Sequence, residues 1–179
     1  MERVLLHACC GICSGDPIRQ LGELGYDVTV YFSNNNLDSI EEYTRRLEAE
    51  RILCSYLGKA LIEAPYEKEK FLCRVQGYEN EPEGGRRCLK CFELRLSDTA
   101  LTAKGLGVEN ITTSMIISPH KNYKLLSEIG ENVCAEYGLS FLKIDFKKKD
   151  GFLKTNMLAK KLGLYRQNYC GCVYSKKRS

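Results

Sequence analysis

Short apolar runs alternate with longer amphipathic segments along this chain, and the alternation restricts its fold more than any other feature. The run at residues 27–34 is β-branched and aromatic, as β-strands are, whereas Ile18, Leu21 and Leu24 recur with helical spacing. This order of strands and helices predicts an α/β fold with a mostly parallel sheet, covered on both faces and joined by right-handed crossovers. The expected strands are residues 2–8, 27–34, 59–65, 109–115 and 139–146, and the expected helices are residues 14–26, 40–58, 87–107, 122–138 and 153–165.

Local signals mark helix ends and the functional edge of this sheet. Ser14 is placed to cap the first helix, Gly25 to end it, and Gly58 to end the second. The turn CCGIC, residues 9–13, follows the first strand directly. Because function in open parallel sheets gathers at the carboxyl ends of the strands, we expect this turn to lie in the functional site.

Cysteine is the unusual component of an otherwise ordinary globular composition. The chain has 179 residues, the size of one domain, and ten of them are cysteine. A run of only three apolar residues precedes His7 and the first cysteines, so no export signal is readable, and no run of about 18 apolar residues predicts a membrane span. We therefore expect one cytoplasmic domain over residues 1–179, without a membrane partner, in which cysteines bind metal or take part in redox chemistry.

The positive charge is small. Lysine and arginine number 27 against 23 acidic residues, giving a formal net charge of +4. The basic residues include KKK at 147–149 and a short basic tail at 176–179. Such runs are typical of solvated surfaces, and they also suit a polyanionic partner such as a nucleic acid.

Spacing divides the ten cysteines into three motifs and three isolated residues. Cys54, Cys73 and Cys134 stand alone within helical patterns, and we expect them to be small buried apolar side chains. The motifs are CCxxC at Cys9, Cys10 and Cys13, CxxC at Cys88 and Cys91, and CGC at Cys170 and Cys172.

The motifs leave the metal open between tetrahedral zinc and an iron–sulfur cluster. Adjacent Cys9 and Cys10 suit a wide cluster better than a single ion, and the first motif lies at the functional edge rather than on an appended knuckle. Cys170 and Cys172 form a further pair able to make a strained, easily reduced disulfide. These points favour iron and sulfur. A zinc-stapled RNA-binding module without redox activity and a thioredoxin-like dithiol enzyme remain the alternatives.

Five segments together resemble the cobalamin-independent epoxyqueuosine reductases of tRNA queuosine biosynthesis. They are HACCGICS at 7–14, YFSNNN with EYTRRLE within 31–48, GGRRCLKCFELRLSDTA at 84–100, TTSMIISPHK at 112–121 and LYRQNYCGCVYS at 164–175. The resemblance implies a single-domain three-layer Rossmann-like sandwich, related to ATP-pyrophosphatase tRNA-modifying enzymes. CCGICS stands where those relatives have SGGxDS, so ATP use is not expected.

The resemblance also implies an activity, a cofactor and a substrate. The activity is reductive removal of the epoxide oxygen from epoxyqueuosine at the tRNA wobble position, which gives queuosine. A [4Fe-4S] cluster on Cys9, Cys10, Cys88 and Cys91 is implied, with Cys170 and Cys172 as a redox-active pair. The electron donor is not identified by the sequence.

The reaction needs two electrons, whereas a [4Fe-4S] cluster ordinarily passes one at a time. We therefore expect a second store of electrons. It is either the Cys170/Cys172 dithiol or an additional iron ion, held by Cys13 and a carboxylate such as Asp16 or Asp145, that also acts as a Lewis acid.

Further candidates for proton transfer and substrate binding lie within the same motifs. His7, His120 and Tyr169 are candidate proton donors. Arg166 and Gln167 are placed to bind a phosphate or the modified base. Substrate binding is also expected of His120 and of Asn34, the first residue of an asparagine run at 34–36 that otherwise caps the next helix.

Overall fold

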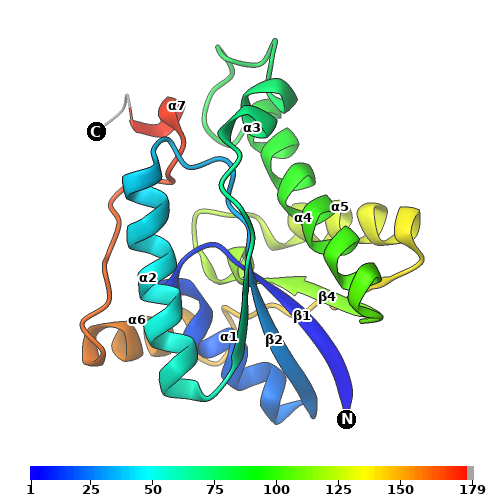
Figure 1. Ribbon diagram of the computed structural model, residues 1–179, viewed down its shortest axis with the longest axis vertical. Coiled ribbons are helices and arrows are strands. Elements are labelled where there is room, and N and C mark those ends of the chain that lie inside the picture. Colours follow the sequence, from blue (N-terminus) through cyan, green and yellow to red (C-terminus); the bar gives the residue numbers. More distant parts are fainter. Residues whose placement is uncertain (177–179) are drawn as a thin grey trace.

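The computed structural model describes residues 1–176 and contains a five-stranded sheet in the order β3-β2-β1-β4-β5 (Figure 1). All four strand pairs are parallel, as predicted, and β1 lies at the centre. The strands are β1 (Glu2–Ala8), β2 (Tyr26–Phe32), β3 (Ala60–Glu63), β4 (Asn110–Thr113) and β5 (Ser140–Phe141). The helices are α1 (Gly11–Glu23), α2 (Ile40–Leu57), α3 (Lys68–Arg74), α4 (Arg86–Leu106), the 3-10 helix η1 (Ser114–Ile117), α5 (Tyr123–Tyr137), α6 (Gly151–Lys161) and α7 (Val173–Lys176).

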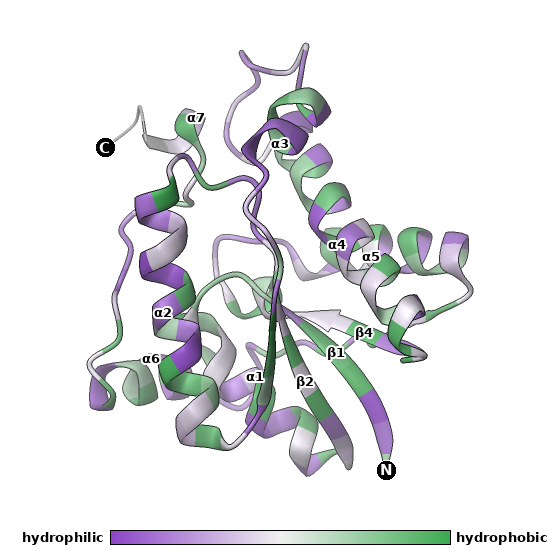
Figure 2. Ribbon diagram, viewed as in Figure 1, coloured by the Kyte–Doolittle hydropathy of each residue, from purple (hydrophilic) through white to green (hydrophobic). Residues whose placement is uncertain are grey.

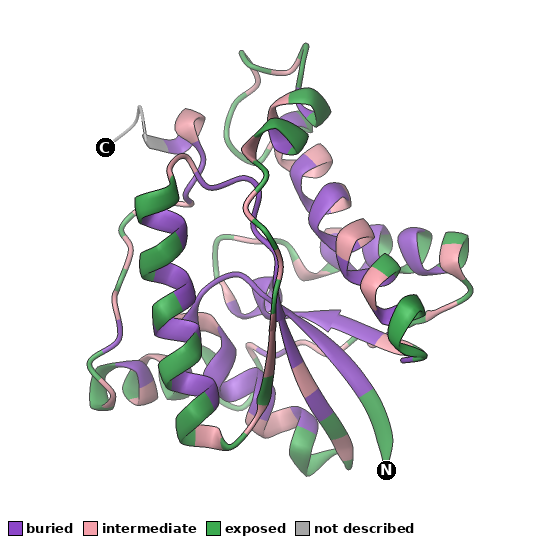
Figure 3. Cartoon of the chain, viewed as in Figure 1, coloured by how far each residue is buried: buried purple, intermediate pink, exposed green. Residues whose placement is uncertain are grey.

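Helices cover the sheet in two layers. Helix α1 packs against both α2 and α6, whereas α4 packs against α5. The middle of β1 is apolar and fully buried between these layers, while the outward face of α2 is exposed (Figures 2 and 3). In Figure 1 the strands rise from the amino terminus toward the end of the molecule that carries α3 and α7. That end is the carboxyl edge of the sheet.

Two glycines permit close contacts between these elements. A Cβ atom on Gly11 would lie 2.7 Å from the main chain of Ala49, so the start of α1 rests directly on α2. A Cβ atom on Gly130 would lie 2.3 Å from the ring of Phe141, so α5 lies directly over β5. Side chains cannot interpenetrate at such distances, and both contacts therefore need glycine.

The end of α2 agrees with the prediction from the sequence, whereas the start of α1 does not. Gly58 ends α2 in a left-handed conformation with φ of 66°, as predicted. The prediction that Ser14 caps the first helix is wrong, because α1 begins after Cys10. The Ser14 hydroxyl instead lies within hydrogen-bond distance of the Cys10 carbonyl oxygen and of Glu50 Oε2, at 3.1 Å from each. The helix ends at Glu23, and Gly25 follows with φ of 88°.

The last strand is shorter than the predicted range 139–146. Ladder hydrogen bonds continue only to the bond from the Leu142 amide to the Ile111 carbonyl. Beyond it, the Ile144 amide bonds back to Leu142, and the Lys148 amide bonds to the Asp145 carbonyl. Local turn bonds thus replace sheet bonds at this edge, although the sequence remains strand-like.

The isolated cysteines differ in their surroundings. Cys54 and Cys134 are buried, as expected, at 2% and 1% exposure. The prediction that Cys73 is buried is wrong. This residue lies on the short helix α3, which buries Phe71 and leaves Cys73 exposed beside Lys70 and Arg74.

The described residues contain no helix that is both long and apolar enough to cross a bilayer. The predicted basic tail falls on residues 176–179, of which 177–179 lie outside the described part of the chain.

Candidate metal and redox centre

Three cysteine thiols meet at the turn between β1 and α1. The Sγ atoms of Cys9 and Cys10 lie 3.8 Å apart, those of Cys10 and Cys13 lie 2.9 Å apart, and all three lie within 4.8 Å of one another. The turn is closed by a hydrogen bond from the Cys13 amide to the Cys10 carbonyl, and the Ser114 hydroxyl lies 3.4 Å from Cys9 Sγ. The predicted CCxxC motif therefore gathers its sulfurs at the carboxyl end of the central strand.

The pKa values of these three thiols are shifted in different directions. Hydrogen bonds from Cys10 and Cys13 hold the pKa of Cys9 well below its usual value, with help from the positive charges of Arg95 and Lys121. Burial raises the pKa of Cys10, and hydrogen bonding to its two neighbours raises that of Cys13. The first negative charge therefore rests on Cys9, which is the form that a metal ligand requires.

The second cysteine motif lies in the first turns of α4. Cys88 Sγ accepts a hydrogen bond from the Gly84 amide at 3.2 Å. The pKa of Cys91 is raised to about 12, chiefly by burial, with a smaller contribution from the Cys170 and Cys172 thiols and against the opposing charge of Arg95. Burial is the main cause that raises the pKa of Cys88, and the Cys170 and Cys172 thiols add to it. Cys91 and Cys172 also belong to one packed cluster, so the CxxC and CGC motifs lie close together. These four thiols are not part of the three-sulfur group at Cys9, Cys10 and Cys13.

The carboxy-terminal segment joins the two groups of thiols. Gln167 Nε2 donates a hydrogen bond to Cys10 Sγ at 2.9 Å. Cys172 packs with Cys91 in a small apolar cluster that also contains Phe71. The seven motif cysteines, which come from three distant parts of the sequence, are thus brought to one edge of the sheet.

Arg95 and Lys121 place positive charge among these sulfurs. Arg95 is 3% exposed, and its Nη1 lies 3.9 Å from Cys91 Sγ. Although burial disfavours the charge of Lys121, the nearby Cys170 and Cys9 thiols keep its pKa above the ordinary value. Positive groups in a buried site favour bound anions and thiolates.

Asn34 makes hydrogen bonds within the protein at both ends of its side chain. Its Nδ2 donates to the Ala8 carbonyl at 2.8 Å, and its Oδ1 accepts from Arg95 Nη2 at 2.7 Å. Both ends of the buried amide are therefore used within the protein. Asn36 differs, because its buried side chain makes no hydrogen bond within residues 1–176.

The three candidate proton donors have different surroundings. His7 Nε2 donates to the Ser33 carbonyl and Nδ1 accepts from the Thr113 hydroxyl, while burial and Arg95 lower its pKa to about 4. A neutral ring with both nitrogens engaged serves structure. Tyr169 donates from its hydroxyl to Asp38 Oδ1 at 2.7 Å, and burial raises its pKa, so it keeps its proton. His120 is exposed beyond η1.

The carboxylates proposed for a second iron do not meet the thiols. Asp16 is buried, but Arg19 Nε at 2.6 Å and Gln20 Nε2 at 2.7 Å occupy its oxygens. Asp145 accepts a hydrogen bond from the Lys147 amide within its own turn. Neither belongs to the group of potential metal-binding atoms at Cys9, Cys10 and Cys13.

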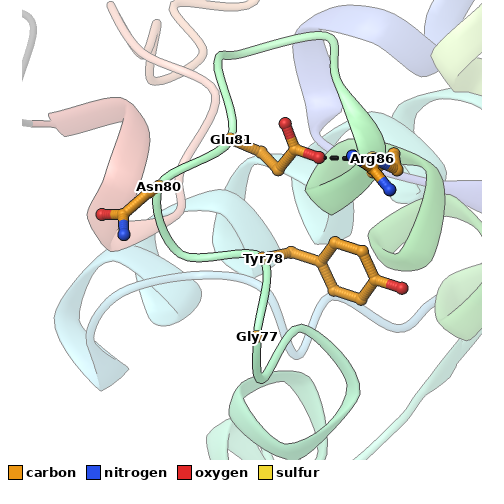
Figure 4. A pocket seen from close by; sticks show the side chains of 5 residues that line it. All are labelled: Gly77, Tyr78, Asn80, Glu81 and Arg86. Carbon is orange, nitrogen blue, oxygen red and sulfur yellow. Dashed lines mark hydrogen bonds and ion pairs between the residues drawn. The ribbon is translucent and has the colours of Figure 1, made fainter.

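Arg166 and the loop before α4 lie at the surface near the centre. Arg166 is exposed and donates a hydrogen bond to Asn156 Oδ1. The loop forms a shallow hollow of about 260 Å³ in which Arg86 pairs with Glu81 at 2.6 Å (Figure 4). The hollow is lined by Gly77, Tyr78, Asn80, Glu81 and Arg86.

Comparison with known proteins identifies the family of this chain. The family model described as epoxyqueuosine reductase QueH matches residues 4–178. The chain belongs to the epoxyqueuosine reductase QueH family. QueH from Streptococcus pyogenes serotype M1 is 37% identical over 97% of this chain and 70% of its own length, and QueH from Thermotoga maritima is 33% identical over 98% and 91%. The resemblance seen in the sequence is confirmed.

Solved structures confirm the Rossmann-like fold of this QueH family member. The U34-tRNA thiolase NcsA from Methanococcus maripaludis, solved with its [4Fe-4S] cluster, superposes with a TM-score of 0.63 at 13% identity, over 97% of this chain and 61% of that one. A predicted subunit of a tRNA methyltransferase from Methanocaldococcus jannaschii superposes with a TM-score of 0.59 at 13% identity, over 89% and 75%.

Sequence reasoning missed the buried charged residues of this QueH centre. Arg46 and Glu42 form an ion pair of 2.8 Å, with side chains only 4% and 5% exposed. Arg95 and Lys121 face the sulfurs from other elements. One signal was available for α2, because Glu42 and Arg46 lie on the same helix face as the apolar Tyr43 and Leu47, the face that must be buried.

Proposed function

We propose that this chain reduces epoxyqueuosine in the wobble position of tRNA to queuosine. The reaction consumes two electrons and two protons, breaks both C–O bonds of the epoxide, forms the alkene and releases the oxygen as water. The observation that carries this proposal is the convergence of all seven motif cysteines at the carboxyl edge of a chain that belongs to the QueH family.

The residues of the centre fit an iron–sulfur cluster. The close group of sulfurs supplies three thiolates, so four cluster ligands require at least one more from the second group. We propose Cys9, Cys10, Cys88 and Cys91, which leaves Cys13, Cys170 and Cys172. Arg95 Nε is buried near Cys91 without a partner in the described residues, an unsatisfied donor that an acidic or sulfide-rich group would satisfy.

The cluster would supply electrons singly to the substrate. The surrounding residues of the chain would orient the cysteine ligands and balance their charge. Gln167 holds Cys10 by a hydrogen bond, and Arg95 and Lys121 offset the negative charge of the thiolates. The two electrons would come either both from the Cys170/Cys172 dithiol, which releases them with two protons as it forms a disulfide, or one from the cluster and one from an additional iron on Cys13. Because Asp16 is already paired with Arg19, binding of iron by this carboxylate requires the ion pair to open.

The substrate is proposed to reach this centre as an exposed nucleotide. Sequence-specific recognition of RNA usually targets unstacked bases of loops, and a wobble nucleotide lies in such a loop. Arg166, exposed just before the CGC motif, is proposed to contact the RNA, and exposed His120 lies on another loop beside the centre. A reductant of unidentified chemistry restores the electrons after each turnover.

The deciding experiment combines metal analysis with turnover. Anaerobically purified protein is assayed for iron, sulfide and zinc, and then for conversion of epoxyqueuosine-containing tRNA with a chemical reductant. At least four irons per chain, absorption near 400 nm and formation of queuosine support the proposal. Colourless protein with stoichiometric zinc that binds tRNA without converting it would replace the reductase with the RNA-binding module.

A further inference from the structure

Arg46 reaches from α2 to the main chain of the CGC motif. Its Nη1 donates a hydrogen bond to the Cys170 carbonyl at 2.9 Å, and its Nη2 donates to the Tyr169 carbonyl at 3.1 Å. The guanidinium carbon also lies 5.4 Å from the centre of the Tyr169 ring. Arg46 is only 3% exposed, so a buried charged side chain serves two consecutive carbonyl groups of this segment.

Glu42 fixes the orientation of this guanidinium. Arg46 Nε donates to Glu42 Oε1 at 2.8 Å, and the Tyr165 hydroxyl donates to Glu42 Oε2 at 2.8 Å. Every nitrogen of Arg46 is therefore engaged in a planar set of hydrogen bonds. The ammonium group of lysine has no such fork and cannot reproduce the set.

Gly171 fits closely against the same surface. Its φ is 122°, and an added Cβ atom would lie 2.4 Å from Leu37 Cδ2 and 3.0 Å from both terminal nitrogens of Arg46. The Gly171 carbonyl accepts a hydrogen bond from the Asp38 amide at 2.8 Å. Three successive carbonyl groups, at residues 169, 170 and 171, are thus held by α2 and the loop that precedes it.

Arg46 also links the two groups of thiols electrostatically. Although burial disfavours its charge, Glu42 and the Cys10 and Cys170 thiols keep its pKa above the ordinary value. Its positive charge therefore lies between the first cysteine motif and the last. A residue needed only for packing would not require a buried charge at this place.

We propose that Arg46 is a positioning residue for the reduction, which holds the main chain of residues 169–171 so that the Cys170 thiol faces the cysteine centre. The expected effect of Arg46 on catalysis rests on the proposed function. The hydrogen bonds by which Arg46 holds residues 169–171 do not depend on that function. The expected signature of the positioning role is loss of turnover with the metal centre and tRNA affinity retained.

The test compares Arg46→Lys and Arg46→Met with Arg51→Lys and Arg51→Met. Arg51 lies on the same helix but pairs at the surface with Glu63 and Glu48. Iron and sulfide content, kcat, KM for tRNA and hydrogen–deuterium exchange are measured for each protein. The Asp38 amide is a useful reporter, because its hydrogen bond to Gly171 exists only while the segment is docked.

For Arg46→Lys we expect wild-type iron content and KM, a fall in kcat of about 10- to 100-fold, and faster exchange confined to residues 169–172 and Asp38. Arg51 variants should match the wild type. If Arg46→Met does not fold, two other variants still test the positioning role. They are Arg46→Lys and Gly171→Ala, of which the second disturbs the contact between Arg46 and residues 169–171 from the side of the segment.

Wild-type kcat in folded Arg46→Lys would overturn the positioning role. Equal falls in kcat and iron content would overturn it as well, because Arg46 would then act on assembly of the centre. If the wild-type protein itself fails to reduce the tRNA, the proposed function is wrong. Hydrogen–deuterium exchange then tests by itself whether Arg46 holds residues 169–171 in place. Unchanged exchange in Arg46→Lys would then overturn the inference.

Discussion

Gln167 donates a hydrogen bond to the sulfur of Cys10 across 157 residues of sequence. The contact joins the segment before the CGC motif to the turn after the first strand. It brings an amide donor to an atom that we propose as a cluster ligand. Hydrogen bonds to ligand sulfurs tune the reduction potential of such clusters, so we expect this single bond to alter the potential of the proposed cluster.

Gln167→Leu is expected to assemble the cluster and lower its reduction potential. The bond is stronger to the more negative, reduced state, and a difference of about 1 kcal/mol between the two states corresponds to on the order of 40 mV for one electron. Potentiometric titration followed by electron paramagnetic resonance measures the change. Gln76→Leu, at an exposed glutamine, is the control. An unchanged potential in Gln167→Leu would show that the bond is absent in the loaded protein.

Cysteine substitutions separate the cluster from the dithiol. Cys88→Ala should lose both cluster and activity, because we propose Cys88 as a ligand. Cys172→Ala should keep the cluster and lose turnover. Cys134→Ala, at a buried thiol of α5, should retain both. Iron and sulfide analysis with single-turnover assays checks all three. A fully active Cys172→Ala protein would remove the dithiol from the mechanism.

Glu50 makes the stability of the fold depend on pH. Its carboxyl group is fully buried, and burial raises its pKa to about 8, against the hydrogen bonds from Ser14 and Cys54. The folded state therefore binds a proton that the unfolded state releases above pH 4.5, so this group lowers stability as pH rises from about 4.5 to 8. The cost at pH 7 is roughly 3 kcal/mol.

Glu50→Gln should accordingly stabilise the fold at pH 7.5, with the gain disappearing by pH 4. Urea unfolding of reduced, metal-free protein at both pH values measures this difference. Glu48→Gln, on the exposed face of the same helix, should show no comparable gain. A Glu50→Gln protein less stable than wild type at pH 7.5 would mean that the buried carboxylate is ionised and stabilised by its neighbours.

Gly130→Ala tests the contact between α5 and β5. The new Cβ atom would lie 2.3 Å from the Phe141 ring, and such overpacking costs about 1–3 kcal/mol. Gly105→Ala is the matched control, because nothing lies within 4 Å of its added Cβ atom in α4. We expect that control to gain about 0.4–1 kcal/mol. Thermal unfolding of the two variants should therefore shift in opposite directions.

The sequence predicted those features that depend on neighbouring residues. Helix α2 ends at Gly58 because a left-handed residue is needed there, and the parallel pairing of the strands follows from their alternation with helices. The position of the CCxxC turn at the carboxyl edge of the sheet followed from the same pattern, whereas its meeting with the other cysteine motifs was implied by the family resemblance. Features set by distant main-chain groups were not predictable in this way.

Arg46 and Asn34 illustrate that limit. In the sequence Arg46 is one of two consecutive arginines in an amphipathic helix, and nothing local shows that its partners are carbonyl groups more than 120 residues away. Asn34 has a side chain suited to reading a base, yet the Ala8 carbonyl and Arg95 use both of its ends. The residue types of Arg46 and Asn34 indicated that both make polar contacts. The tertiary structure determined that their partners are groups of this protein.

The distance in sequence between Cys10 and Gln167 also sets an order of events during synthesis. The ribosome adds about 5–20 residues per second, so roughly 8–30 seconds separate the emergence of these two partners. Until then the nascent chain presents the thiols of Cys9, Cys10 and Cys13 without the segment that covers them. The contact between Gln167 and Cys10 can therefore form only late in synthesis, after the segment that carries Gln167 has been made.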